Sequence, residues 1–365
     1  MSGLAEVFRT HGAVYCAAGG DAVPARHRAV IDSITHCRTE ALGTLTCSCD
    51  ECRQLFDIYR SCGNRHCPVC GKAKGREWLA KQLDRLLPVP HFMITFTVPV
   101  AFRSLFFAHQ KLCYQAFFRA SSAVLYQLGS ETTYFPGDTP GFFGVLHTWG
   151  RNLSYHPHIH YIVPAGAFDR QNHRWHDCSR AFYAPVRILS KLVKTRFFDL
   201  IERAGLLEEI PAGAFEKDWN VDARPVGTGV RAVRYLSAYV FRTAISDKRV
   251  VSVGEDSVTF AYTDTKSGVE KHMSLKPFEF IRRFLQHVLP KGFMKIRYFG
   301  FLHPSSAIPL KLAVALLEAA KDVRAVVHRK PAKSKTGAPF CPACAGSGHV
   351  LFFSPPRAWF HSGFT

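Results

Sequence analysis

The alternation of apolar and polar positions predicts an antiparallel hairpin near the middle of the chain. Two apolar stretches, 144–149 and 156–163, are each short enough for one strand, and a turn around 152–155 joins them. In the second stretch His158 and His160 stand two positions apart, so both side chains point to the same face of the strand. The hairpin therefore has one apolar face and one face that carries a pair of imidazoles.

The remaining periodicity predicts a mixed fold around this hairpin. Strand-like runs occupy 91–99, 257–263, 270–275 and 294–302, helical spacing covers 76–87, 102–128, 188–204, 230–242, 277–288 and 309–327, and 1–45 is largely helical. Strand, helix and hairpin in that order predict an α+β fold. We expect an antiparallel sheet of five or six strands with helices on one face.

The charge of the chain adds a polyanionic partner to this picture. The 365 residues include 47 Lys and Arg but only 28 Asp and Glu, a formal net charge of +19. Such an excess favours nucleic acid, bound through phosphate neutralisation, with a membrane surface as the alternative. No apolar run approaches the ~18 residues that span a bilayer, and the N-terminus lacks a signal-type segment. We therefore expect a cytoplasmic protein with no membrane partner.

The histidines of the hairpin are candidate metal ligands. Two imidazoles on one strand face can share an ion, although histidines are also common on the polar edge of a half-buried strand. Their density in this apolar setting favours the metal site. With the predicted turn, His147 lies roughly opposite His158 or His160, about 4.5–5.5 Å away at Cβ, and we predict it as the third ligand. His156 ranks below His147, because Pro157 interrupts the ladder beside it.

The cysteines predict zinc rather than disulfides. Seven of the 12 lie between Cys37 and Cys70, in closely spaced pairs and without a secretory signal. Two Cys-x2-Cys pairs separated by fourteen residues match a zinc ribbon, formed by Cys49, Cys52, Cys67 and Cys70. Further residues remain for a second zinc or as alternative ligands: Cys37, Cys47, Cys62 and His66. A lone pair near the C-terminus is half a site with open partners (His349, spare N-terminal ligands, or none): Cys341 and Cys344.

A later helical stretch carries two tyrosines one turn apart. Tyr235 and Tyr239 are i and i+4, so both hydroxyls emerge on one helix face and can approach one phosphate. Tyrosines at this spacing are usually core or interface residues. Nearby guanidinium groups favour phosphate contact, because they bind phosphate through paired hydrogen bonds. The basic residues in question are Arg231, Arg234 and Arg242 here, and Arg65, Lys72, Lys74 and Arg76 around the zinc knuckles.

Together these motifs resemble one known family. The stretches that carry the resemblance are 61–70 (SCGNRHCPVC), 87–92 with 96–99, 145–150 (VLHTWG), 156–160 (HPHIH), 235–246 and 279–290. The sequence resembles the rolling-circle transposases of bacterial insertion sequences, the two-tyrosine branch of the HUH endonuclease superfamily with an N-terminal zinc-binding domain. The resemblance implies an HUH nuclease-like catalytic domain with an RRM- or ferredoxin-like core.

The resemblance also implies a mechanism. His158 and His160, with a third ligand, would hold Mg²⁺ or Mn²⁺ on the scissile phosphate of single-stranded DNA at transposon ends. Tyr235 or Tyr239 would attack it to give a 5′-phosphotyrosine. Arg242 stands where related endonucleases often carry a lysine. One or two structural zinc ions would support recognition of the ends, hairpins included, on the nucleoid of a bacterial cytoplasm.

Three regions follow from this interpretation. We expect a helical and zinc-binding DNA-recognition domain over 1–86, an HUH-type catalytic domain over 87–302, and a helical, basic C-terminal tail over 303–365. Two alternatives stay open. A replication initiator or relaxase would use the same chemistry in another setting. A non-catalytic zinc-ribbon DNA-binding protein would keep the histidines and tyrosines as structural residues only.

Overall fold

The chain forms two compact units, each assembled from separate stretches of sequence. The computed structural model describes residues 3–130, 139–169, 171–172, 174–178, 183–241, 244–264, 267–321 and 339–356. The first unit comprises Met1–Lys74, Phe241–Val288 and Arg329–Thr365, and the second comprises Gly75–Val240 and Leu289–His328. Both units combine helices with antiparallel strands, which confirms the predicted α+β class. The units do not follow the expected ranges 1–86, 87–302 and 303–365, because Phe241–Val288 groups with the N-terminal residues.

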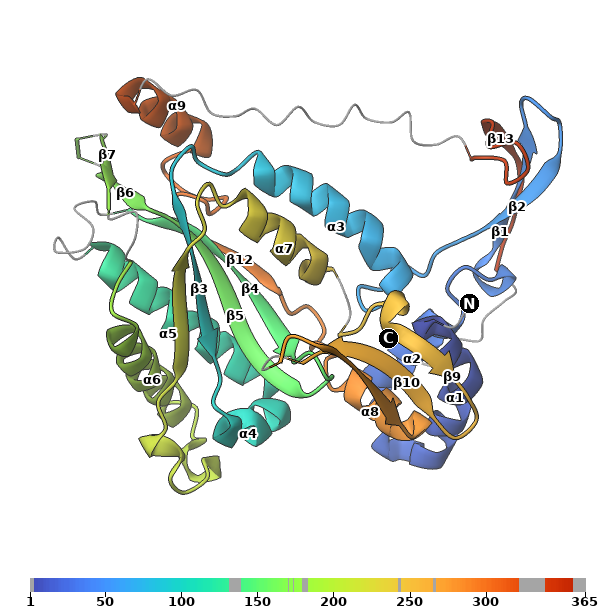
Figure 1. Ribbon diagram of the computed structural model, residues 1–365, viewed down its shortest axis with the longest axis horizontal. Helices are drawn as coiled ribbons and strands as arrows, with labels where there is room; N and C mark the ends of the chain where they lie inside the picture. Colours follow the sequence, from blue (N-terminus) through green and yellow to red (C-terminus); the bar gives the residue numbers. More distant parts are fainter. Residues whose placement is uncertain are drawn as a thin grey trace. The chain divides into compact units, whose positions relative to one another are not determined.

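An antiparallel sheet of five strands forms the centre of the second unit (Figure 1). Its strands are, in spatial order, β12 (Ile296–Gly300), β4 (Gly141–Trp149), β5 (Tyr155–Pro164), β3 (His91–Thr97) and β8 (Asn220–Pro225). The hairpin of β4 and β5 lies at the position that the alternation predicts, and each neighbouring pair is antiparallel. The sequence pattern does not predict β8, because its charged residues and proline give no apolar alternation.

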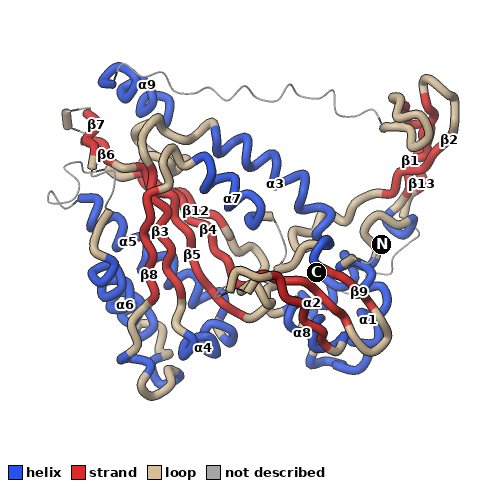
Figure 2. The backbone as a smooth tube through the Cα atoms, in the orientation of Figure 1, coloured by secondary structure: helices blue, strands red, loops and turns tan. Residues whose placement is uncertain are grey.

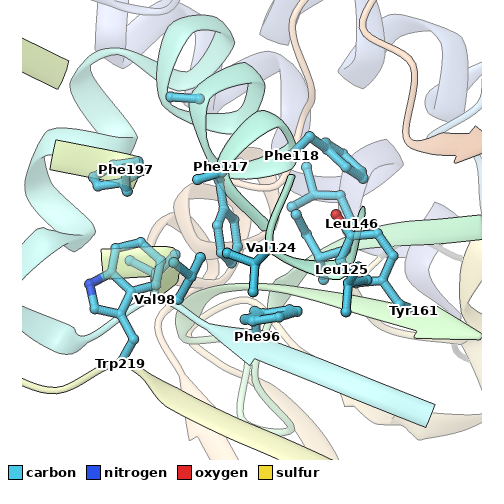
Figure 3. Packing of buried hydrophobic residues seen from close by; sticks show 14 of the residues in the cluster. Phe96, Val98, Phe117, Phe118, Val124, Leu125, Leu146, Tyr161, Phe197 and Trp219 are labelled. Carbon is cyan, nitrogen blue, oxygen red and sulfur yellow. The ribbon is translucent and has the colours of Figure 1, made fainter. Parts of the chain in front are cut away.

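The apolar face of this sheet packs against α4 (Arg103–Ala108), α5 (Gln110–Ser130) and α6 (Val186–Glu202). Figure 3 shows Phe96 and Tyr161 from the strands beside Phe117 of α5. Burying each such side chain contributes about 1.5–3 kcal/mol. The Tyr161 hydroxyl keeps a partner in this core, since its oxygen lies 2.7 Å from Ser121 Oγ. The predicted helix 102–128 is divided between α4 and α5.

The opposite face of the sheet carries the histidines and is also covered by helices. Helix α7 (Val230–Val240) places the ring of Tyr235 6.3 Å from the ring of His160. Trp78, in the second-unit part of α3 (Pro68–Leu83), packs edge-on against Phe143 of β4, with 6.0 Å between the ring centroids. Helices therefore cover both faces of the sheet, whereas the sequence pattern predicts them on one.

A two-stranded ribbon and a last helix complete the second unit. Strands β6 (Gly166–Asp169) and β7 (Arg174–Asp177) pair with each other. Phe168 of β6 and Leu317 of α9 (Leu310–Lys321) share a small apolar core with Phe301. The helix predicted over 309–327 begins as expected, and its last six positions lie outside the described residues.

The helical part of the first unit contains α1 (Leu4–Gly19), α2 (Ala25–Thr35) and α8 (Pro277–Leu285) with a separate sheet. That sheet has the order β11 (Glu270–Leu275), β10 (Val258–Thr263) and β9 (Val250–Val253). Phe8 of α1 packs edge-on against Phe284 of α8 at 5.1 Å between centroids. The strands predicted over 257–263 and 270–275 therefore exist, but they do not extend the histidine sheet. Among the described residues, no helix is both long enough and apolar enough to cross a bilayer.

A second three-stranded sheet of the first unit joins distant parts of the sequence. Strands β1 (Thr44–Cys49) and β2 (Leu55–Tyr59) form a hairpin, and β13 (Gly348–Ser354) pairs with the free side of β1 (Figure 2). The order is β13-β1-β2, with antiparallel pairs throughout. We call these three strands and their two cysteine-bearing turns, 49–54 and 341–346, the ribbon.

Candidate functional site

Three histidines converge on the face of the sheet below α7. His147 of β4 is the direct partner of His158 on β5, and Val145 is the partner of His160. The ring centroids lie 5.2 Å apart for His147 and His158, 4.8 Å for His147 and His160, and 4.9 Å for His158 and His160. One nitrogen from each ring lies within 4.8 Å of the others. The hairpin register thus brings together the three residues that the sequence nominates as metal ligands.

Neighbouring groups orient two of these rings. Nδ1 of His158 lies 2.7 Å from the carbonyl oxygen of His156, and a carbonyl oxygen can only accept, so Nδ1 carries the proton. The lone pair of His158 is then on Nε2. Nδ1 of His160 lies 2.8 Å from the hydroxyl oxygen of Thr95, on the adjacent strand β3. Such contacts to the second ring nitrogen are typical of metal-binding histidines.

The environment keeps these imidazoles neutral. Burial, helped by repulsion from the neighbouring imidazoles, lowers the pKa of His147 and of His158 well below the usual value. Burial also lowers the pKa of His160 to about 4, although the negative charge of Asp222 opposes the shift. A neutral imidazole is the form that binds metal. Among the described residues the grouped candidate ligands are three imidazoles. Imidazole ligands suit a transition-metal ion better than Mg²⁺, so Mn²⁺ is the better fit of the two predicted ions.

His156 stands outside this group, as its lower ranking predicts. Its Nδ1 lies 2.5 Å from a guanidinium nitrogen of Arg103, which can only donate. Its ring centroid is 5.3 Å from that of His158. The side chain therefore binds Arg103, while its carbonyl oxygen positions His158.

Tyr235 is the tyrosine that the structure places at the histidines. Its ring is 6.3 Å from that of His160, and 48% of the residue is exposed. Tyr239 lies one turn later on α7, and its side chain is outside the part of the structure that is described. Arg242 also lies outside the described residues. The structure therefore places Tyr235 beside His160, and the roles of Tyr235, Tyr239 and Arg242 stay predictions.

A pocket of about 530 Å³ opens beside Tyr235. It is lined by the loop before α7, by the first turns of that helix and by β3: Met93, Val226, Gly227, Thr228, Arg231, Ala232 and Tyr235. Gly229 in this loop has φ +76°, and a Cβ there would meet Cγ of His91 at 3.1 Å. The glycine-rich stretch 227–229 was the available sequence signal for this pocket, but a short Gly-x-Gly alone is too common to be informative.

Lys295 is a basic residue near the histidines that the sequence does not single out. Its backbone oxygen accepts a hydrogen bond from Leu146, and its ammonium nitrogen lies 4.4 Å from the ring centroid of Trp149. Trp149 in turn stacks on His147, with 5.3 Å between the rings. The charge of Lys295 is one of the smaller causes of the lowered pKa of His147 and His158. Only the pairing of β12 with β4 shows that Lys295 lies near the histidines.

A group of four cysteines lies in the first unit at the start of α3. Its members are Cys37, Cys62, Cys67 and Cys70. Sγ of Cys70 lies 3.7 Å from that of Cys37 and 3.6 Å from that of Cys62. Burial raises the pKa of the Cys37 thiol to about 12, so this thiol stays protonated at neutral pH without a bound cation.

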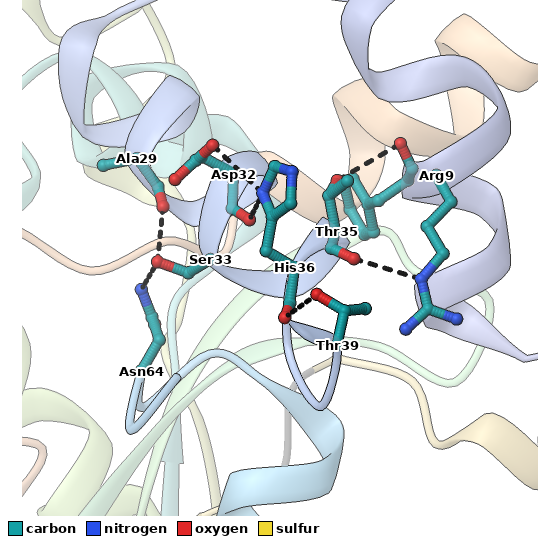
Figure 4. A network of polar contacts seen from close by, with 9 residues as sticks. Arg9, Ala29, Asp32, Ser33, Thr35, His36, Thr39 and Asn64 are labelled. Carbon is teal, nitrogen blue, oxygen red and sulfur yellow. Dashed lines mark hydrogen bonds and ion pairs between the residues drawn. The ribbon is translucent and has the colours of Figure 1, made fainter. Parts of the chain in front are cut away.

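Polar contacts hold the loop of this group against α2 (Figure 4). The Asn64 amide donates to Ser33 Oγ at 3.2 Å, and the Ser33 hydroxyl donates to the Ala29 carbonyl at 2.7 Å. The Thr39 hydroxyl donates to the carbonyl of His36 at 2.8 Å, just after α2. These contacts fix the backbone on both sides of the site.

The structure separates the two cysteine pairs that the sequence places in one ribbon. Cys67 and Cys70 belong to the group above, whereas Cys49 and Cys52 lie with the C-terminal pair, Cys341 and Cys344. The prediction of a single four-cysteine site from the first two pairs is therefore wrong. Spacing along the chain is compatible with either combination, and the pairing of β13 with β1 decides between them.

Two further candidate zinc ligands lie outside both groups of described cysteines. Nε2 of His66 accepts a hydrogen bond from Arg65 at 3.3 Å. The thiol of Cys47 is buried and donates to the carbonyl of Leu45 at 3.6 Å. His66 belongs to neither group of four cysteines, so the structure contradicts its prediction as a zinc ligand.

Most of the basic residues predicted to contact DNA are exposed. They are Arg65, Lys74, Arg76, Arg231 and Arg234. Lys74 donates to the carbonyl of Gly63 at 3.3 Å, and the side chain of Lys72 lies outside the described part. Exposure makes phosphate contact feasible, and the contact itself stays a prediction.

Known proteins match the chain over the two regions that carry these sites. A family model described as "Putative transposase" matches residues 141–308, and one described as "Transposase zinc-binding domain" matches residues 7–98. A protein named putative transposase y4qJ, from Sinorhizobium fredii, is 37% identical over 319 residues, 82% of this chain and 80% of its own length. The transposase for insertion sequence element IS801, from Pseudomonas savastanoi pv. phaseolicola, is 29% identical over 283 residues, 73% of this chain and 68% of its own. No solved structure matches the chain.

The matches define the class of protein as a transposase, an enzyme that processes DNA. More narrowly, the chain belongs to the insertion-sequence transposases with an N-terminal zinc-binding domain, the family that its motifs resemble. The zinc-binding model covers Cys37, Cys62, Cys67 and Cys70, and together they support structural zinc in the first unit.

Proposed function

We propose that this transposase nicks and rejoins single-stranded DNA at the ends of a mobile element through a covalent tyrosine intermediate, by a rolling-circle route. The observation that carries the proposal is the meeting of three imidazoles with a tyrosine. The ligand nitrogens of the histidines lie within 4.8 Å of one another, and the Tyr235 ring is 6.3 Å from that of His160. A phosphate bound at the imidazoles would stand beside the nucleophile, the arrangement that phosphoryl transfer needs.

The protein's contribution to metal binding is a set of pre-oriented neutral rings. His147, His158 and His160 would hold a divalent ion, with Mn²⁺ the better fit. When bound, the ion would polarise the scissile phosphate and stabilise the charge that develops on it. Thr95 and the His156 carbonyl hold the rings of His160 and His158 before any ligand arrives.

Tyr235 would supply the nucleophile for the first cleavage. Its phenolic oxygen forms a bond to phosphorus while the bond from phosphorus to the 3′-oxygen breaks. The phenolic proton passes to solvent, and the departing 3′-oxygen takes up a proton. The products are a 5′-phosphotyrosine and a free 3′-hydroxyl, and reversal of the same step rejoins strands without ATP. Tyr239 would cleave the second strand end, with Arg242 neutralising phosphate.

The pocket beside Tyr235 would receive the nucleotide next to the scissile phosphate. Its volume of about 530 Å³ suits one nucleotide, and Arg231 contributes a guanidinium at its wall. Arginine binds phosphate through paired hydrogen bonds, so Arg231 would fix the adjoining phosphate. The first unit, with its zinc and exposed basic residues, would recognise the element ends, hairpins included.

The Lys295 ammonium lies near enough to the histidines to lower the pKa of His147 and His158, so we assign it a contact to the scissile phosphate. Lys295→Met should then slow cleavage about 10–100-fold, because it removes one charge-assisted contact to the phosphate. It should leave the Mn²⁺ requirement unchanged or lower it, since a cation near the ligands is lost. Single-turnover cleavage rates measured against Mn²⁺ concentration separate the two effects. Lys291→Met, on the same loop, is the control. A rate restored fully by extra Mn²⁺ would contradict a direct phosphate contact.

Thr95→Val should weaken Mn²⁺ binding about 10–100-fold, because the ring of His160 loses the hydroxyl that orients it. The two side chains have nearly the same shape, so the fold should be retained. The expected signature is cleavage that recovers at high Mn²⁺. Thr259→Val, on strand β10 of the first unit, is the control, and an equal effect there would argue against an orienting role.

The central test is a covalent-adduct assay with labelled single-stranded DNA carrying candidate element ends. A metal-dependent adduct on the 5′ side of the cut supports the proposal. The same adduct at a plasmid origin, but at no element end, would instead support the replication-initiator or relaxase alternative. Tight binding without an adduct on any end, with either Mg²⁺ or Mn²⁺, would favour the non-catalytic DNA-binding alternative.

A further inference from the structure

The ribbon of the first unit brings together two cysteine pairs from opposite regions of the sequence. Cys49 and Cys52 follow β1, and Cys341 and Cys344 precede β13. The Sγ atom of Cys49 lies 3.4 Å from that of Cys344, and the Sγ of Cys52 lies 3.7 Å from that of Cys341 and 3.5 Å from that of Cys344. The zinc-binding family model ends at residue 98 and therefore does not include the second pair.

These separations fit a shared metal ion rather than disulfides. A disulfide joins its sulfurs at about 2.05 Å. Four thiolates around a tetrahedral zinc, each about 2.3 Å from the ion, stand roughly 3.8 Å apart. The observed spacing of 3.4–3.7 Å lies near the second value, and all four residues are free cysteines.

The two turns share one backbone design, which indicates a built site. In each turn, the residue four positions after the first cysteine has a left-handed backbone, with φ 62° at Arg53 and 59° at Ala345. The N–H of that residue donates to the carbonyl of the first cysteine, at 3.2 Å for Cys49 and 2.9 Å for Cys341. This conformation is uncommon for residues other than glycine, and it occurs at the same position in both turns.

Backbone N–H groups also point at the sulfurs. The N–H of Cys52 donates to Sγ of Cys49 at 3.4 Å, and the N–H of Gly346 donates to Sγ of Cys344 at the same distance. Such donors stabilise negative charge on sulfur, as thiolate ligands require. The turns therefore present four sulfurs toward one point with their charge already supported.

Contacts beyond the sulfurs hold the two turns face to face. The Asp50 N–H donates to the carbonyl of Ser347 at 2.8 Å, and Asp50 Oδ1 lies 2.7 Å from Nδ1 of His349. Gly348 sits where an added Cβ would lie 2.7 Å from the carbonyl oxygen of Ser48. His349, a candidate partner for the C-terminal pair, thus binds Asp50 instead of joining the cysteines.

The apolar core of the ribbon is too small to hold the three strands alone. Its buried members are Cys47, Cys49, Phe56 and Cys341, and two of these are themselves members of the cysteine group. Small modules with so little apolar burial generally need a metal or disulfides to fold. The exposure of Cys52 and Cys344 also leaves one side of the group open to solvent.

We propose that Cys49, Cys52, Cys341 and Cys344 form a second structural zinc site, which fastens strand β13 to the N-terminal hairpin. The DNA-recognition unit is then discontinuous in sequence: its zinc-dependent ribbon is completed by ligands far outside the region matched by the zinc-binding family. The two zinc sites are independent of each other, and the more exposed one can be lost without the other. The inference does not depend on the nicking chemistry.

Zinc content of the full-length chain tests the proposal. The measurement is made in a His158→Ala/His160→Ala background, so that zinc bound at the histidines is not counted. We expect two zinc ions per chain there, and one after adding Cys341→Ser/Cys344→Ser. Cys47→Ala is the matched control: it removes a buried cysteine of the same ribbon that is not a ligand, and it should keep both ions.

Hydrogen exchange provides the second readout. In the Cys341→Ser/Cys344→Ser variant, amides of Gly348–Ser354 should exchange as fast as in an unpaired segment, while those of Ala25–Thr35 keep their protection. If the double variant does not fold, Cys344→Ser alone tests the same site, because this side chain is exposed. We expect it to release one zinc ion to a chelator much faster than the parent.

Three outcomes would overturn the assignment. The double variant could retain both zinc ions, or the control Cys47→Ala could lose one as well. The parent protein could also hold a single zinc together with disulfides in the ribbon, which mass spectrometry under non-reducing conditions would detect as a loss of hydrogen.

Discussion

His158→Ala is expected to slow DNA cleavage about a thousandfold, a loss of roughly 4 kcal/mol of transition-state stabilisation. The variant removes one of three imidazoles whose nitrogens lie within 4.8 Å of one another, and two imidazoles hold an ion poorly. Cleavage of a labelled single-stranded element end, measured at several Mn²⁺ concentrations, provides the rate. Binding of the same DNA should change little, since recognition is assigned to the first unit.

His156→Ala is the matched control for this loss. It stands two residues away on the same strand, but its side chain binds Arg103, and its carbonyl oxygen remains available to His158 after substitution. We expect a rate within a few fold of the parent. Equal rates for His158→Ala and the parent would support the non-catalytic alternative, in which the histidines are structural.

Tyr235→Phe is expected to abolish the covalent adduct at the first cut, a loss of about 10⁴-fold or more in rate, because the nucleophilic oxygen is removed. The phenyl ring keeps its packing near His160, so metal binding and folding should be retained. The measurement is the fraction of labelled DNA that stays attached to protein after denaturation.

Two further variants, Tyr239→Phe and Tyr59→Phe, test whether the loss of the first adduct is specific to Tyr235. Tyr239→Phe should still form the first adduct but fail to complete the second cleavage and joining. Tyr59 is exposed on β2 and lies far from the histidines in the sequence. Tyr59→Phe should therefore leave adduct formation unchanged. An unchanged first adduct in Tyr235→Phe, with its loss in Tyr239→Phe, would assign the first attack to Tyr239.

The histidine site could be predicted from the sequence because its determinants are local. A hairpin places residues of neighbouring strands opposite each other through the length of its turn, so His147 and His158 meet without any knowledge of the rest of the fold. Tyr235 and Tyr239 follow from helical spacing in the same manner. The proximity of this helix to the histidines joins distant parts of the sequence. It was expected from the family resemblance and not from the periodicity of the sequence.

What the sequence did not reveal depends on contacts between distant segments. Lys295 reaches the site only because β12 pairs with β4, and β8 is an edge strand with no apolar alternation. The cysteine pairs are the clearest case, because three Cys-x2-Cys motifs allow several combinations of equal chemical quality. The order of strands in the ribbon selects among them, and strand order is set by packing across hundreds of residues.

The discontinuity of the ribbon has a consequence for biosynthesis. Cys52 and Cys341 are 289 positions apart, and a ribosome adding about 5–20 residues per second needs roughly 15–60 s to cover that distance. Within this interval the ribosome adds the histidine hairpin and both tyrosines, while β1 and β2 remain without their third strand. A translation product that stops before Cys341 would contain the residues proposed for cleavage but would lack the second cysteine pair of the ribbon. Under the zinc assignment proposed above, the ribbon would close only after Cys344 has been synthesised, and therefore after the histidine hairpin and both tyrosines.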